Sequence, residues 1–179
     1  GTGARGEAFR KVTYLQLGKY ETIDQIEGAK YLATMPWVDA NRIGIWGWSY
    51  GGFISSSCLL KGDGVFKTAI AVAPVTNWRY YDNIYTERFM RTPKENPDGY
   101  DQNSPLFFAD KLKGNLLLVH GTADDNVHVQ NTLELSERLV QANKKFDMML
   151  YTNRNHSIYG GNTRLHLFTK LEDYFKTNL

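Results

Sequence analysis

The stretch IGIWGWSYGG (residues 43–52) limits the possible folds of this chain more than any other part of its sequence. A short apolar run, Arg42 to Trp46, leads directly into the pentapeptide Gly-x-Ser-x-Gly around Ser49, and a helical pattern follows. A strand that turns sharply into a helix holds the intervening serine in a strained backbone conformation. We expect a side chain at Gly47 or Gly51 to crowd the neighbouring strand and helix, which would explain both glycines.

Such a turn has a chemical consequence for Ser49. Open α/β sheets place their sites at the carboxyl ends of the strands, so the turn would present the Ser49 hydroxyl there. The N–H of Tyr50 would then be directed at a developing oxyanion. The alternative is a glycine-rich turn that merely allows close packing, but the flanking strand and helix favour a nucleophilic serine.

Three further apolar runs resemble the first and predict strands. None of them alternates apolar with polar residues, so each needs cover on both faces. Helical patterns lie between and after the runs, and this alternation predicts a mostly parallel sheet covered by helices on both faces, the α/β class. The runs are Ala69–Pro74, Asn115–His120 and Met148–Tyr151, and the helical patterns are Phe53–Leu60, Val129–Ala142 and Leu165–Phe175.

Two other segments complete the predicted organisation. Thr22 and Gln25 have the spacing of a capping box, which predicts a helix that starts there and stops at Pro36. Residues 75–113 form a long excursion, and its turn-forming part, Thr92 to Pro105, is interpreted as an insertion over the sheet edge. At 179 residues the chain is expected to form one domain.

Composition argues against several classes of function. The formal net charge of +2 gives no reason to expect a nucleic acid or an anionic membrane as a partner. No apolar run approaches the roughly 20 residues that span a bilayer. The single cysteine, Cys58, has no metal-ligand spacing around it, so neither an internal disulfide nor structural zinc is expected. We expect no cofactor.

A serine nucleophile needs an imidazole that accepts its proton. Of the four histidines, one ends a strand, one enters a helix and one lies inside the last helix, namely His120, His128 and His166. His156 alone lies in a loop at the predicted carboxyl edge of the sheet, after the final strand. A lone loop histidine is usually only solvated, but the serine turn makes His156 the candidate base.

The imidazole in turn needs a carboxylate that orients it. The stretch HGTADDNVH follows the third strand and offers Asp124 and Asp125, between which the spacing does not decide. One of the two is expected to form the turn and cap the next helix. With either aspartate, the order Ser, Asp, His along the chain is that of the α/β-hydrolase fold.

GWSYGG, HGTADDNVH and the later histidine loop together resemble the catalytic domain of the prolyl oligopeptidase family of serine peptidases, over nearly the whole chain. The segment AVAPVTNWRYYDNIYTERF narrows the resemblance to the dipeptidyl peptidases of that family. The resemblance implies that Asp124 is the acid and that Asn126 binds a carbonyl of the substrate backbone. It also implies a pocket for proline, formed by Val75, Trp78, Tyr81, Tyr85, Val127 and Tyr50.

An aromatic box of this kind suits a rigid apolar ring that has no N–H. Tyr81 and Tyr85 are four residues apart and share one face if their segment is helical. Without the resemblance, ordinary core packing would explain these aromatic residues equally well.

The resemblance further implies that residues 1–179 are the C-terminal portion of a longer α/β-hydrolase peptidase domain. Such domains normally have several strands before the serine turn, whereas the residues before Ser49 offer one helix and no further convincing strand. The missing parts would be the N-terminal strands, a tyrosine hydroxyl that completes the oxyanion site, and a β-propeller domain whose acidic pair grips the substrate amine. A homodimer and an exported or membrane-tethered location are expected by resemblance alone.

The implied function is that of a serine exopeptidase that releases X-Pro, and less readily X-Ala, dipeptides from peptide N-termini through an acyl-enzyme. An acyl-peptide hydrolase, a prolyl tripeptidyl peptidase or an esterase would use the same serine turn, because fold alone does not fix chemistry. The pocket aromatics favour the dipeptidyl peptidase. A non-catalytic binding relative should have lost a member of the set Ser49, Asp124 and His156, and all three are present.

Overall fold

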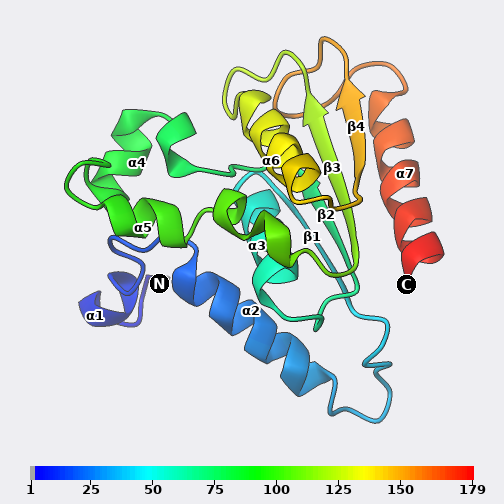
Figure 1. Cartoon of the computed structure of the whole chain (residues 1–179), viewed down its shortest axis with the longest axis horizontal. Helices are drawn as coiled ribbons and strands as arrows, with labels where there is room; N and C mark the ends of the chain where they lie inside the picture. The colour runs from blue at the N-terminus through cyan, green and yellow to red at the C-terminus, as the bar shows by residue number, and fades with distance from the viewer. Residues whose placement is uncertain (1–2) are drawn as a thin grey trace.

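The structure is a computed structural model that describes residues 3–179. Four strands form one sheet in the order β1-β2-β3-β4, and every neighbouring pair is parallel (Figure 1). The strands are β1 (Gly44–Trp48), β2 (Thr68–Val72), β3 (Asn115–Gly121) and β4 (Asp147–Tyr151). The predicted parallel sheet is confirmed. β1 starts two residues later than expected, after a turn in which the Arg42 N–H donates to the Asp39 carbonyl, and ends two residues later, because Gly47 and Trp48 still pair with β2.

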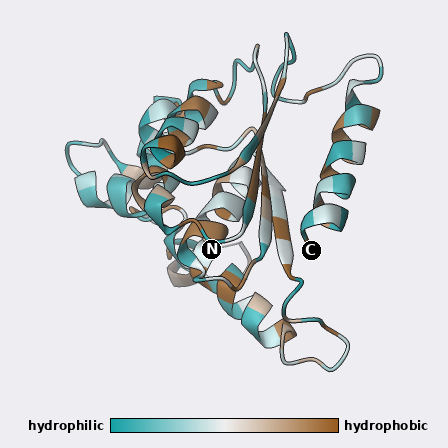
Figure 2. Cartoon of the chain, turned by 45° about the vertical axis from the view of Figure 1, so that its right-hand side comes forward, coloured by the Kyte–Doolittle hydropathy of each residue, from teal (hydrophilic) through white to brown (hydrophobic). Residues whose placement is uncertain are grey.

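Helices cover both faces of the sheet, as predicted. α3 (Tyr50–Lys61) and α6 (Gln130–Gln141) lie on one face, and α2 (Lys19–Leu32) packs against α3. α7 (Thr163–Asn178) covers the other face and stands on its own side of the sheet in Figure 2. None of the helices within residues 3–179 is long and apolar enough to cross a bilayer.

Two separate cores form, because successive side chains along a strand point to opposite faces. On the central strands the two sets are all fully buried, which explains why these sequences do not alternate between apolar and polar residues. Figure 2 shows the apolar strands between their helical layers. Ala69, Ala71, Leu116 and Leu118 face α3 and α6, whereas Ile70, Val72, Leu117 and Val119 face α7.

The long excursion between β2 and β3 is folded throughout. It contains η1 (Trp78–Tyr80), α4 (Asn83–Met90), α5 (Pro97–Gln102) and η2 (Pro105–Lys111). The side chains of Asp82 and Asn96 cap α4 and α5 by accepting the N–H groups of Tyr85 and Gly99. α4 and α5 lie beside the N-terminal segment with α1 (Glu7–Arg10) in Figure 1, and the Leu15 N–H donates to the Phe89 carbonyl.

The predicted capping box at the start of α2 is wrong. The helix begins three residues before Thr22, which is buried inside it. Gly18 precedes the first turn at φ +92°, where a Cβ would lie 2.2 Å from the Phe53 ring. Its N–H donates to Glu21 Oε2 at 3.1 Å, so Gly18 and Glu21 start the helix in place of Thr22 and Gln25.

Candidate active site

Ser49 lies between the end of β1 and the start of α3 with φ 60° and ψ −116°. A non-glycine residue with positive φ is strained, and surrounding structure must hold it there. The Ser49 N–H donates to the Val72 carbonyl at 2.8 Å, and the Ser49 carbonyl accepts the Phe53 N–H at 3.0 Å. Ser49 therefore both extends the sheet ladder and begins the helix, while its side chain is half-exposed.

The glycines around Ser49 differ in what they permit. A Cβ at Gly47 would lie 2.1 Å from the carbonyl oxygen of Gly51, so the turn excludes a side chain there. A Cβ at Gly51 would meet nothing within 4 Å, so the predicted crowding at that position is wrong. The backbone of Gly51 is what crowds Gly47, and the second crowded glycine is Gly52, whose Cβ would lie 2.8 Å from the Val72 carbonyl oxygen.

Asp124 and His156 form a hydrogen bond of 2.7 Å between Oδ2 and Nδ1. A carboxylate accepts, so Nδ1 carries the proton and the imidazole Nε2 is left as a proton acceptor. The Asp124 side chain is fully buried, whereas the His156 side chain retains 21% of its exposure. The neighbouring Asp125 is exposed, so of the two aspartates in HGTADDNVH the structure brings Asp124 to His156.

The surroundings of Asp124 keep its carboxylate ionised. Burial by itself raises the pKa of Asp124, but hydrogen bonds from His120, His156 and the Asn126 backbone outweigh it. The pKa therefore lies below its ordinary value of 3.8. The other carboxylate oxygen, Oδ1, accepts the N–H groups of Asn126 and Val127, each at 3.0 Å.

The loop that carries His156 is attached to the sheet beside Ser49. The indole N–H of Trp48 donates to the His156 carbonyl at 2.9 Å. Gly121 lies against the same loop, since a Cβ there would be 2.3 Å from the Arg154 carbonyl oxygen. In the part of the chain that the structure describes, no hydrogen bond joins the Ser49 hydroxyl to the imidazole. The structure thus brings His156 to Asp124 and to the residue before Ser49.

The six residues predicted to line a pocket belong to one cluster. Trp78 is its centre, with ring centroids 5.4 Å from Tyr50, 5.8 Å from Tyr81 and 5.7 Å from Tyr85. Asn126 is exposed beside the cluster, and its Oδ1 accepts the Tyr81 hydroxyl at 2.7 Å. The remaining members, Val75 and Val127, are buried.

Tyr81 and Tyr85 do not share a helix as expected. Tyr81 follows η1, and α4 starts only at Asn83, because the Asp82 carboxylate caps it. The two rings nevertheless meet edge to face with centroids 5.3 Å apart. The bend at Asp82, rather than helical spacing, brings them together.

Tyr50 is the first residue of α3, where a backbone N–H has no partner within the helix. Its hydroxyl donates to Glu21 Oε1 at 2.5 Å. Burial, and then this hydrogen bond, raise the pKa of Tyr50 above its ordinary value. The carboxylate of Glu21 therefore fixes the ring that follows Ser49.

Sequence reasoning missed two residues near the site, Glu21 and His120. Glu21 contacts Tyr50, which lies 29 positions later in the sequence, and no local sequence pattern predicts such a contact. His120 is fully buried, with Nε2 at 3.3 Å from Asp124 Oδ2. A polar residue directly after the apolar run LLLV was a signal that could have marked His120 as a buried partner.

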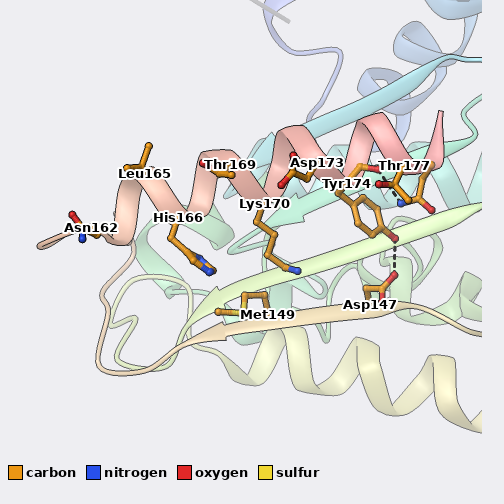
Figure 3. A pocket seen from close by; sticks show the side chains of 11 residues that line it. Asp147, Met149, Asn162, Leu165, His166, Thr169, Lys170, Asp173, Tyr174 and Thr177 are labelled. Carbon is orange, nitrogen blue, oxygen red and sulfur yellow. Dashed lines mark hydrogen bonds between the residues drawn. The ribbon is translucent and has the colours of Figure 1, made fainter.

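Of the cavities within the described residues, one lies away from this cluster and another borders it. One, of about 900 Å³, separates α7 from β4 and is lined by residues such as Met149, His166 and Lys170 (Figure 3). It includes none of the predicted site residues, and Figure 3 shows the Tyr174 hydroxyl bonded to Asp147 at one end of it. The other, of about 760 Å³, is lined by Tyr81 and Asn126 and so adjoins the aromatic cluster.

Comparisons with known proteins agree with one another. The profile of the prolyl oligopeptidase family matches residues 1–179. Dipeptidyl peptidase 4 of Felis catus is 44% identical to this chain, over 98% of this chain and 23% of its own length. Prolyl endopeptidase FAP of Mus musculus is 42% identical, over 98% of this chain and 24% of its own length. The crystal structure of Porphyromonas gingivalis dipeptidyl peptidase 4 aligns with a TM-score of 0.97 and 60% identity, over 99% of this chain and 25% of that one. The chain spans about a quarter of the length of these relatives.

Proposed function

The chain belongs to the prolyl oligopeptidase family of serine peptidases, and we propose that its full-length protein releases X-Pro, and less readily X-Ala, dipeptides from peptide N-termini. The family match confirms the resemblance drawn from GWSYGG and HGTADDNVH. Relatives named dipeptidyl peptidase 4 support the dipeptide product.

Ser49, His156 and Asp124 are the proposed catalytic residues. The Ser49 hydroxyl attacks the carbonyl carbon of the scissile bond while His156 Nε2 takes its proton, and the proton then passes to the leaving amine. Asp124 holds His156 in the required tautomer through the Nδ1 hydrogen bond. Water attacks the resulting acyl-enzyme by the same route in reverse, which frees the dipeptide.

The N–H of Tyr50 is one proposed donor to the oxyanion, because it lies at the start of α3 next to the nucleophile. The aromatic cluster around Trp78 is the proposed pocket for the proline ring. Flat aromatic walls favour an apolar ring and disfavour a polar or long side chain. Asn126, bonded to Tyr81, is the proposed partner of a substrate carbonyl.

One observation carries the proposal. Ser49, strained at φ 60°, follows a tryptophan whose indole holds the backbone of His156, and His156 in turn bonds the buried Asp124. Hydrogen bonds thus link the residue before Ser49, the loop of His156 and the Asp124 carboxylate, which supports a triad at the carboxyl edge of the sheet, where this fold places its reactions.

The test compares four substrates on the full-length protein, with Ser49→Ala as the control. We expect the amide of Gly-Pro to be cleaved faster than that of Gly-Ala, and both faster than the amide of Ala-Ala-Pro or a simple ester. Ser49→Ala should abolish every activity. A preference for the ester, or activity that survives the substitution, would contradict the proposal.

Endopeptidase activity is a second candidate, because a relative at 42% identity is named prolyl endopeptidase FAP. The pocket for proline would serve both reactions, so the distinction lies in the substrate amine. An acetylated Gly-Pro amide separates the two. Cleavage of the acetylated and the free substrate at similar rates would favour the endopeptidase.

We propose in addition that these residues form the C-terminal portion of a longer peptidase domain, joined to a β-propeller. Within residues 3–179, β1 pairs with β2 alone, and its Trp46 is half-exposed. An edge of this kind readily accepts further strands. The homodimer, the exported location and the acidic residues for the substrate amine stay predictions.

A further inference from the structure

His120 lies near the end of β3 and has no exposed surface. Its imidazole contacts three polar groups. Nε2 lies 2.8 Å from the Val127 carbonyl oxygen and 3.3 Å from Asp124 Oδ2, and Nδ1 lies 2.7 Å from Thr132 Oγ1. A buried histidine with partners on both nitrogens is held in one orientation.

The partners decide which nitrogen carries a proton. A carbonyl oxygen accepts only, so Nε2 of His120 must be protonated. The Thr132 hydroxyl, itself fully buried, can donate to Nδ1. With this arrangement both ring nitrogens have a partner, and the Nε2–H faces both Val127 and Asp124.

The two oxygens that share this N–H belong to different parts of the proposed machinery. Asp124 Oδ2 also accepts His156 Nδ1, so a shift of the carboxylate moves the imidazole of His156. Val127 is fully buried in the aromatic cluster that forms the proposed pocket. His120 is therefore placed to fix the orienting acid and one pocket wall together.

We propose that His120 is a positioning residue. It holds the Asp124 carboxylate, and through it His156, in a fixed position relative to the pocket. The proposal rests on the proposed function, because it deepens the role of the same site. His120 touches no reacting atom. It acts through a single N–H that points at Val127 and Asp124.

The test uses a matched pair of polar substitutions in the full-length protein. In His120→Gln the side-chain amide is long enough to place an N–H where Nε2–H lies. In His120→Asn the amide reaches only the position of Nδ1 and can still meet Thr132. His166→Leu removes a different histidine contact, the hydrogen bond to the Tyr151 hydroxyl in the cavity between α7 and β4, and serves as a control away from Asp124.

Two readouts separate positioning from stability. The first is the rate at which diisopropyl fluorophosphate labels Ser49, a step in which an Oγ–P bond forms, the P–F bond breaks and His156 takes the proton. The second is the pair of kcat and KM for a Gly-Pro amide. Thermal melting checks that each variant is folded.

We expect His120→Asn to lose about ten- to hundredfold in labelling rate and in kcat, with a smaller rise in KM, because small displacements of a catalytic group cost rates of this order. His120→Gln should recover both rates to within about threefold. His166→Leu should match the unsubstituted protein. This pattern would support the positioning role.

Equal rates in the Gln and Asn variants would overturn the inference, as would a failure of both to fold, which would make His120 purely structural. A different result would contradict the proposed function: the absence of labelling at Ser49 in the unsubstituted protein, whatever the rates of the His120 variants.

Discussion

At the scale of single residues, the tautomer of His156 is the most sensitive feature of the site. The Asp124 carboxylate requires a proton on Nδ1. In Asp124→Asn the side-chain amide can present an N–H to the ring instead, which favours the tautomer with its proton on Nε2. We predict a fall in kcat of about 10⁴-fold with KM little changed, measured with a Gly-Pro amide. A loss below about tenfold would mean that Asp124 does not orient the base.

The pKa of Asp124 also predicts a pH dependence of stability. Its folded pKa lies below the ordinary 3.8, so the ionised carboxylate stabilises the fold above that value. The contribution is lost as pH falls through the folded pKa. We expect the free energy of unfolding, measured by urea titration, to fall more steeply below about pH 4 in the unsubstituted protein than in Asp124→Asn. Equal slopes would contradict this assignment.

Some residues of the candidate site could be predicted from local sequence signals, and others could not. Ser49 and His156 follow from the glycine pattern and the position of a loop, both of which are local signals. The spacing did not decide between Asp124 and Asp125; the family resemblance implied Asp124, and the hydrogen bond from His156 agrees with it. The polar residue after the apolar run LLLV could have marked His120 as buried, but its contact with Asp124 forms only in the folded chain.

At the scale of elements, apolar runs predicted all four strands, whereas the element boundaries depended on contacts across the fold. α2 starts at Lys19 because Gly18 packs on Phe53, which lies far along the chain. α4 starts only after Tyr81, because Asp82 caps it. Tyr81 and Tyr85 do contact each other, but not through the helical spacing that was expected. Periodicity finds an element, and tertiary packing sets its ends.

The turn between β1 and α3 predicts opposite outcomes for two glycines of one motif. Gly47→Ala should shift or unfold the turn, because its Cβ would lie 2.1 Å from a backbone oxygen. Gly51→Ala has open space around its Cβ and lies in α3, where alanine is favoured over glycine. We expect the first to lower the melting temperature by several degrees and the second to leave it unchanged or raised, by differential scanning calorimetry. Equal melting temperatures would contradict the turn geometry.

At the scale of the whole molecule, the sheet has an open edge at β1 within the described residues. We predict that residues 1–179 expressed alone have no useful peptidase activity, because that edge is exposed and a second oxyanion donor is expected from outside. Loss of such a donor alone costs about 10² to 10³ in turnover. Hydrolysis of a Gly-Pro amide by the isolated chain at a rate near that of the full-length protein would refute this.

The central claim is that Ser49 attacks a substrate whose proline lies in the aromatic pocket, with His156 as its base. It is tested most directly with a phosphonate diphenyl ester of Gly-Pro, followed by peptide mapping of the full-length protein by mass spectrometry. The account predicts one covalent adduct on Ser49 that is absent from Ser49→Ala and His156→Gln. An adduct on another residue, or none in a preparation that hydrolyses Gly-Pro amides, would contradict it.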